Sequence, residues 1–460
     1  MELYTWFDAE GSAESPDATC ADGKGDAAWG MLPVFTAPVL AMAKTQIPAS
    51  SALSNVRYEI RGRLARRAHE MERMGYEIIS LNIGNPGAFG FRAPETMRLA
   101  MIENLAAAEG YCHQKGIFPA REAVVMQQQD RGVLDVTAED VFIGNGVSEL
   151  IDLVLRALLE PGDEVLVPSP DYPLWTAAVT LNGGRAIHYP CRPERGFEPD
   201  PEEVARLVTR RTRAIVVINP NNPTGAVYSR ETLGALARLA EQHRLVVFAD
   251  EIYDGMTYDG AEFVPMATLV RETLCGTLSG LSKVYRACGY RVGWAVFSGA
   301  RDQAAAYLQG LELLSSLRLC SNVPGQWAVQ TALGGYQSIR DLVSPGGRLH
   351  QSRQAIIDGA AASRHLALTP PRGALYAFVQ VRRDHLPDFD DQAFALDLLE
   401  NRHVLVAPGV SFNVPYSDHF RITNLPDPET LRTVFVRIEE ELDSWASGKA
   451  ARGSTLRVVQ

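Results

Sequence analysis

The sequence predicts an α/β fold whose large domain carries a mostly parallel sheet flanked by helices. From Asp140 onward, short apolar runs alternate with amphipathic segments of helical length, as in successive β-α units. The runs 214–218 (Ala-Ile-Val-Val-Ile) and 245–249 (Leu-Val-Val-Phe-Ala) are apolar throughout. Strands that are apolar on both faces are typical of a parallel sheet covered by helices on either side. Ligands are then expected at the carboxyl ends of the strands.

The N-terminal part of the chain is expected to contribute to a second, smaller domain. Residues 1–50 are rich in acidic, Gly, Ser and Pro residues and predict a disordered extension. Residues 51–90 predict an N-terminal arm and part of the small domain, with a basic amphipathic helix over 53–74. A short strand is expected at 77–83, and it ends in the turn 84–87 (Gly-Asn-Pro-Gly).

The large domain is expected over 91–344 and the rest of the small domain, an α+β unit, over 345–446. In the large domain we predict helices at 94–105, 120–131, 148–159 and 231–243, strands at 141–143, 164–167, 186–189, 214–218 and 245–249, and further helical structure over 306–336. In the C-terminal third we predict a long helix after 345–347, strands at 374–381 and 403–406, a helix at 428–445 and a disordered tail over 447–460.

Composition argues against several classes of function. The formal net charge of −11 is unfavourable for a nucleic-acid partner. The six cysteines form no C-x-x-C pair and the nine histidines form no H-x-x-x-H pattern, so we expect no metal site, no disulfide framework and a cytoplasmic location. The apolar stretch 27–42 is interrupted by Pro33 and Pro38, so we expect neither a signal peptide nor a membrane-spanning segment there, and no membrane partner.

The first of four notable strand ends carries a glycine-containing turn. Asn145-Gly-Val-Ser148 follows a predicted strand and opens a helix. Backbone N–H groups at a helix N-terminus, reached across a glycine, can bind a phosphate or another anion. Taken alone, a plain strand-to-helix turn with Ser148 as the helix cap explains this motif better.

The other three strand ends carry an aromatic, an amide and a carboxylate. Prolines in the loop 168–175 hold Tyr172 as a platform for a flat ring, although a surface loop explains that motif better alone. The turn 219–225 (Asn-Pro-Asn-Asn-Pro-Thr-Gly) contains two X-Pro bonds, either of which can be cis. They predict a fixed backbone geometry that holds an Asn amide in place. Asp250 ends the next strand, where a buried carboxylate needs a partner; a surface helix cap is the alternative.

Lysine is rare in this chain, which has 39 arginines and five lysines. Lys24, Lys44 and Lys449 fall in the predicted tails, so only Lys115 and Lys283 belong to the folded body. A partly buried lysine can lose its proton and form imines, which arginine cannot do. On rarity alone, GC-rich coding is the simpler explanation of the bias.

Together these motifs resemble the class I/II aminotransferases of fold type I, which depend on pyridoxal phosphate (PLP). The resemblance covers residues 53–445. It is carried by Asn222-Pro-Thr-Gly225, Asp250-x-x-Tyr253, and Lys283 with Arg291 eight residues on. Within the family the sequence is most similar to the bacterial alanine (glutamate–pyruvate) aminotransferases, through the segments 55–62, 81–86, 281–286 and 318–338.

The resemblance implies a role for each matching residue. Lys283 would hold PLP covalently and move the α-proton of the substrate, and Asp250 would pair with the pyridine nitrogen of PLP. Arg421 would bind the substrate α-carboxylate as a bidentate fork, helped by the Gly84 N–H. The resemblance also implies that Tyr172 stacks on the cofactor ring, and that Asn222 (also near the substrate) and Tyr253 bond its phenolic oxygen. The phosphate would be bound by Gly146, Val147, Ser148 and Arg291, and by Tyr111 of a neighbouring subunit.

One position departs from the family pattern. Many relatives have a phosphate-binding serine three residues before the lysine, where this chain has Gly280. Ser279 or Ser282 could take its place, and we include Ser282 among the expected cofactor residues. Lys115 is then expected to be an ordinary surface or interface lysine.

The expected function is transamination by a homodimer with shared active sites, between L-alanine plus 2-oxoglutarate and pyruvate plus L-glutamate. Tyr58 and Arg61 are the candidates for substrate choice, although a solvated charge in a basic run explains Arg61 equally well. The alternatives are an aminotransferase of a specialised biosynthetic pathway, a PLP-dependent lyase, and a non-enzymatic PLP-sensing regulator. The first 50 residues contain no DNA-binding module, which argues against the regulator.

Overall fold

The computed structural model describes residues 47–56 and 62–448. The chain divides into two units, Met1–Ala49 and Ser50–Gln460, and every element named below belongs to the second. Tyr58 and Arg61 lie outside the described residues, as do nearly all of the predicted N-terminal extension and C-terminal tail.

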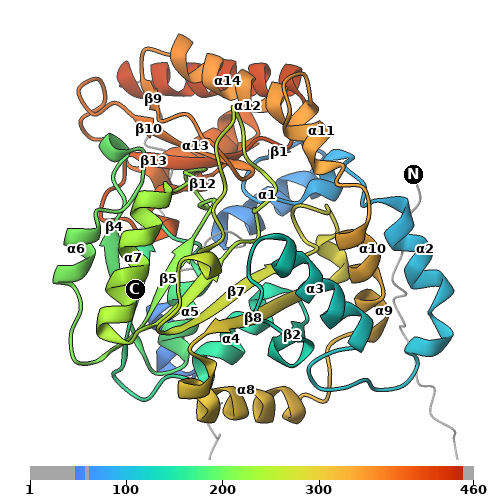
Figure 1. The fold of residues 1–460 in the computed structure, drawn as a ribbon. Helices are drawn as coiled ribbons and strands as arrows, with labels where there is room; N and C mark the ends of the chain where they lie inside the picture. The colour runs from blue at the N-terminus through green and yellow to red at the C-terminus, as the bar shows by residue number, and fades with distance from the viewer. Residues whose placement is uncertain (1–46, 57–61, 449–460) are drawn as a thin grey trace, which may run out of the picture. The chain divides into compact units, whose positions relative to one another are not determined.

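A seven-stranded sheet forms the large domain, in the order β2-β8-β7-β6-β5-β3-β4 (Figure 1). Its strands are β2 (Val141–Gly144), β3 (Glu164–Ser169), β4 (Arg185–Pro190), β5 (Thr212–Ile218), β6 (Val246–Asp250), β7 (Leu274–Gly280) and β8 (Gly293–Gly299). Strands β3 to β7 pair in parallel, and β8 runs antiparallel to both β2 and β7. The predicted mostly parallel sheet is confirmed.

Helices cover both faces of this sheet because its strands are apolar on both faces. In β5, Ala214, Val216 and Ile218 pack into one core cluster, and Ile215 and Val217 pack into another. The first cluster includes side chains of α4 (Val147–Arg156), α5 (Leu174–Leu181) and α8 (Ala305–Leu317); the second includes side chains of α3 (Phe118–Asp130), α7 (Arg230–His243) and α10 (Ala328–Gly334). This arrangement follows from the period-2 alternation of side chains along a strand.

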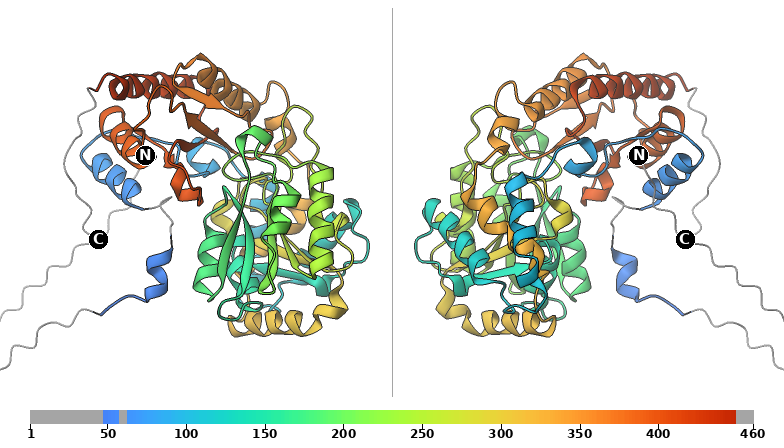
Figure 2. Two further views of the ribbon diagram at one scale, coloured as in Figure 1. Left: turned by 90° about the vertical axis from the view of Figure 1, so that its left-hand side faces the viewer. Right: turned by 90° about the vertical axis from the view of Figure 1, so that its right-hand side faces the viewer.

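The C-terminal third forms a separate antiparallel sheet, in the order β12-β13-β10-β9. Its strands are β9 (Leu366–Leu368), β10 (Tyr376–Val381), β12 (Ala407–Pro408) and β13 (His419–Thr423), and its helices are α12 (Arg348–Ala362), α13 (Asp391–Arg402) and α14 (Pro428–Ala446). Strand β1 (Ile79–Ser80) pairs in parallel with β11 (Val404–Leu405), which attaches the N-terminal segment to this domain. The predicted smaller α+β domain is confirmed, and two side views show it in orange and red above the large sheet (Figure 2).

Several element boundaries differ from the predicted ones. The helix expected at 53–74 is a short 3-10 turn, Ser51–Asn55, and α1 (Arg63–Arg73), with 57–61 outside the described residues. The strand expected at 77–83 is reduced to β1, because only two residues find a pairing partner in β11. Strands β7 and β8 of the large domain and β9, β12 and β13 of the small domain were not predicted. The remaining helices are α2 (Glu95–Glu103), α6 (Pro201–Arg206), α9 (Val323–Gln326) and α11 (Ile339–Val343).

None of the helices in the described part of the chain has both the length and the apolar composition needed to cross a bilayer.

Candidate active site

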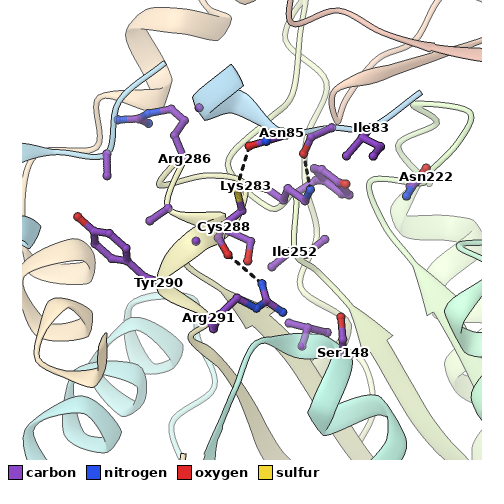
Figure 3. A pocket seen from close by; sticks show the side chains of 18 of the residues that line it. Ile83, Asn85, Ser148, Asn222, Ile252, Lys283, Arg286, Cys288, Tyr290 and Arg291 are labelled. Carbon is purple, nitrogen blue, oxygen red and sulfur yellow. Dashed lines mark hydrogen bonds between the residues drawn. The ribbon is translucent and has the colours of Figure 1, made fainter. Parts of the chain in front are cut away.

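A cavity of about 1100 Å³ opens where strands of the large sheet end, and residues of both domains line it (Figure 3). The predicted site residues on its wall are Gly84, Val147, Ser148, Tyr172, Asn222, Asp250, Tyr253, Ser282, Lys283, Arg291 and Arg421. Gly146 and Tyr111 do not line it, and the Tyr111 side chain is 81% exposed. The structure therefore gathers in one cavity residues that lie more than 300 positions apart in the sequence.

Lys283 lies just beyond the end of β7, and its side chain is half-buried. Its Nζ donates a hydrogen bond to the backbone carbonyl of Gly84, over 2.6 Å. Strand β7 ends at Gly280, so Lys283 lies in the turn beyond its carboxyl end, where an α/β sheet of this kind binds ligands. The amine is thus held inside the cavity and within reach of a ligand there.

Asp250, the last residue of β6, is 3% exposed. Its Oδ2 accepts a hydrogen bond from the Trp175 indole N–H (2.9 Å), and its Oδ1 accepts one from the Ile252 backbone N–H (3.4 Å). Burial raises the pKa of Asp250 to about 6, against the opposing effects of the Trp175 hydrogen bond and the Lys283 charge. A buried carboxyl poised in this way is suited to pair with a cationic ring nitrogen.

Gly146 makes room for the guanidinium of Arg291 at the N-terminus of α4. Its φ is +81°, and a Cβ atom there would lie 2.4 Å from Arg291 Nη2. Arg291 Nη1 donates to the Cys288 carbonyl (2.9 Å) and Nη2 to the Asn145 carbonyl (3.3 Å). Because Ser148 lies in the first turn of the same helix, the arrangement combines a helix N-terminus, a hydroxyl and a cation, which suits a phosphate.

The structure distinguishes between the two serines proposed to replace the family serine. Ser279 is 2% exposed and donates to the Glu251 carbonyl over 3.4 Å, whereas Ser282 lines the cavity. A Cβ atom on Gly280 would lie 2.7 Å from the Val292 carbonyl oxygen, so this backbone has no space for a serine. The position of Ser282 supports its expected role, and that of Ser279 does not.

Arg421 lies in β13, is 1% exposed, and reaches the cavity from the small domain. Its Nη1 donates to Asn222 Oδ1 (2.9 Å), and its Nη2 donates to the Asn82 carbonyl. Both X-Pro bonds of the 219–225 turn, Asn219–Pro220 and Asn222–Pro223, are cis. The Asn222 amide of this turn faces the arginine, as the hydrogen bond between them shows.

Two aromatic residues of the site were missed from sequence. Trp175 lies at the end of the loop 168–175 and was assigned no role, yet it is fully buried and donates a hydrogen bond to Asp250. Tyr376 opens β10, where no motif surrounds it, and it lies against Arg421. Its position on a predicted strand of the small domain was the only available signal.

Lys115 was expected at the surface or at an interface, and the surface assignment is wrong. Its side chain is buried, and its Nζ lies 3.0 Å from Glu312 Oε2 and 3.5 Å from Glu139 Oε2. These ion pairs compensate for burying the amine.

The chain is similar to known aminotransferases over most of its length. Residues 76–438 match the family model described as aminotransferase class I and II. The chain is 50% identical over 380 residues to glutamate-pyruvate aminotransferase AlaA of Escherichia coli K12, covering 83% of this chain and 94% of the relative. It is 45% identical over 397 residues to an alanine aminotransferase of Mycobacterium tuberculosis H37Rv, covering 86% and 92%.

Solved structures agree with the sequence comparisons. An aminotransferase from Escherichia coli superposes with a TM-score of 0.86 at 47% identity, covering 87% of this chain and all of that chain. Alanine aminotransferase from Pyrococcus furiosus gives a TM-score of 0.82 at 34% identity, covering 86% of this chain and all of that one.

Proposed function

The chain belongs to the class I and II aminotransferases, as its motifs predicted, and from this premise we propose that it interconverts L-alanine plus 2-oxoglutarate and pyruvate plus L-glutamate. The observation that carries the proposal is the meeting of Lys283, Asp250 and Arg421 in one cavity. The names of relatives at 45–50% identity support alanine and glutamate as the substrates. We also propose a cytoplasmic location.

The residues present fit PLP, which we propose as the cofactor. The cavity offers an amine (Lys283), a buried carboxyl (Asp250) and an anion-binding turn in which a Cβ on Gly146 would collide with Arg291. Val147, Ser148, Ser282 and Arg291 would hold the phosphate, Tyr172 would face the ring, and Asn222 and Tyr253 would approach its phenolic oxygen. When bound, PLP supplies an electron sink that stabilises negative charge at the substrate Cα.

The chain's own residues then divide the work of the reaction. Lys283 would take the α-proton from the substrate Cα as general base and deliver it, as general acid, to the C4′ carbon of the cofactor. Asp250, with its raised pKa, stays hydrogen-bonded to Trp175 and balances a positive ring nitrogen. Arg421 binds the α-carboxylate and Gly84 donates its N–H to the same group, which orients the Cα–H bond toward Lys283.

We further propose a homodimer in which Tyr111 reaches the phosphate site of the partner. Tyr111 is largely exposed and lies outside the cavity of its own chain. Helices α2, α3 and α10 lie near one another on one side of the large domain (Figure 1). On or beside them are further exposed apolar side chains: Leu99, Ile102, Leu105, Phe118 and Tyr336. An apolar surface of this kind is suited to association with a second copy.

Half-reaction spectroscopy tests the proposal directly. The PLP-loaded protein is mixed with single amino acids, and the cofactor absorbance, the 2-oxo acid and free ammonia are measured. We expect L-alanine and L-glutamate to change the absorbance and to yield pyruvate and 2-oxoglutarate without ammonia. Ammonia release would support the lyase alternative, and a response confined to another amino acid would support a specialised aminotransferase. No response to any amino acid would support a regulator.

A further inference from the structure

We propose that Tyr376 is a positioning residue of the carboxylate-binding site, whose ring holds the Arg421 guanidinium in its binding orientation. The inference rests on the proposed function, in which Arg421 binds the substrate carboxylate.

The Tyr376 ring packs against the arginine. The guanidinium carbon of Arg421 lies 4.2 Å from the centroid of this ring and 4.6 Å from that of Phe412. Tyr376 opens β10 and Arg421 lies in the paired strand β13, where its direct partner is Phe378. Tyr376 is therefore the diagonal cross-strand neighbour of Arg421, a distance that aromatic side chains span.

The hydrogen bonds to Asn222 and Asn82 act on the guanidinium from its edge. Asn222 and the Asn82 carbonyl accept hydrogen bonds from its two Nη groups, and these bonds act in the plane of the group. Rings packed on a guanidinium resist tilting out of that plane, and they favour the cation by their quadrupole. The ring of Tyr376 thus supplies a restraint that the amide and the carbonyl do not.

The Tyr376 hydroxyl touches the other half of the predicted carboxylate site. A Cβ atom on Gly84 would lie 2.1 Å from Tyr376 Oη, so the two residues are in direct contact. The Tyr253 hydroxyl donates to Tyr376 Oη over 3.2 Å. Burial raises the pKa of Tyr376, but the charges of Lys283 and Arg421, together with hydrogen bonds from the Tyr253 hydroxyl and the Gly84 backbone, leave this pKa below its usual value. Tyr376 therefore contacts both groups expected to bind the carboxylate.

The test separates the ring from the hydroxyl by equilibrium binding. Propionate, which has the carboxylate and carbon chain of alanine but no amino group, is titrated into the PLP-loaded protein by calorimetry. Tyr376→Leu removes the ring, and Tyr376→Phe keeps it. Phe420→Leu is the matched control, because Phe420 lies on the same strand as Arg421 but packs into the small-domain core beside Phe394.

We expect Tyr376→Leu to weaken propionate binding about tenfold and Tyr376→Phe to change it less than about twofold. In steady-state kinetics Tyr376→Leu raises KM for L-alanine and L-glutamate by a similar factor, with a smaller change in kcat. Phe420→Leu lowers the unfolding midpoint but leaves propionate affinity unchanged.

Three results would overturn the inference: Tyr376→Leu binding propionate like the wild type, Tyr376→Phe losing as much affinity as Tyr376→Leu, or Phe420→Leu losing as much as Tyr376→Leu. Arg421→Lys distinguishes this failure from failure of the proposed function. If Arg421→Lys weakens propionate binding and Tyr376→Leu does not, only the role of Tyr376 is wrong. If Arg421→Lys has no effect, Arg421 is not the carboxylate ligand.

Discussion

The two sides of the cavity are built in different ways. On the large-domain side, Asp250 and Lys283 stand at or just beyond the ends of strands that are otherwise almost wholly buried. At that point a polar side chain can line the crevice even when it is as buried as Asp250, which is 3% exposed. On the small-domain side, Arg421 and Tyr376 lie within paired strands and are almost fully buried. Their polar groups must be satisfied by residues from elsewhere, such as Asn222.

Under the proposed function, the residues of one side carry out the reaction and those of the other side bind the substrate. The strand-end residues supply the amine and the carboxyl, whose protonation states matter for the reaction. The strand-interior residues supply a fixed cation between two rings, which suits the binding of a carboxylate of fixed position. We therefore expect substitutions on the first side to lower kcat and substitutions on the second to raise KM.

Lys283→Ala is expected to have the largest effect, because no other described lysine lies in the cavity. In the proposed mechanism, loss of the amine removes both the covalent attachment and the general base, so we expect turnover to fall by at least about 10⁴-fold. The visible absorbance of the PLP-loaded protein shifts to that of the free cofactor. Lys115→Met is the matched control and should keep the turnover and the absorbance of the wild type. If Lys283→Ala also kept both the turnover and the absorbance, the assignment of Lys283 would be refuted.

Asp250→Asn should have the next largest effect, because it keeps the shape of the side chain and removes its charge. We expect kcat to fall about 10²- to 10³-fold while KM changes little, since in the proposed mechanism the carboxyl acts on the ring nitrogen and not on the substrate carboxylate. Trp175→Phe deletes one donor to Asp250 and should cost about tenfold in kcat. Near-normal kcat in Asp250→Asn would exclude this carboxyl from the reaction.

The large-domain side could be predicted from the sequence because its features are local. Apolar runs end in Asp250 or precede the turn 219–225, and these neighbours in sequence remain neighbours in space. Even so, β7 and β8 were missed. They contain Gly276, Gly280, Gly293 and Gly299, and glycine has low strand propensity.

The small-domain side could not be derived from local pattern. Arg421 was identified only through the family resemblance, and Tyr376 was not identified at all. Both depend on the register of β10 against β13, which is a property of tertiary pairing. Trp175 was missed for a related reason, because its partner Asp250 is 75 residues away in the sequence.

Asp171 links the large-domain and small-domain sides of the cavity, and we expect its substitution to have the smallest effect, a change in the pH dependence of stability. It is fully buried beside Tyr172 and accepts hydrogen bonds from Thr176 Oγ1 (2.5 Å) and from Asn413 Nδ2 (2.8 Å) of the small domain. Burial raises its pKa from 3.8 to about 7, against these hydrogen bonds. The folded state therefore holds a proton that the unfolded state releases above pH 3.8.

The stability contributed by this proton is fully present below pH 3.8 and is lost as the pH rises through about 7. The free energy of unfolding of the wild type should thus fall, relative to Asp171→Asn, by about 1.4 kcal/mol per pH unit across that window. Urea unfolding at pH 5 and pH 7 measures the difference, with Asp130→Asn at the exposed end of α3 as the control. Parallel pH profiles for wild type and Asp171→Asn would show that Asp171 is charged throughout. The contact between the two sides would then be an ordinary charged hydrogen bond.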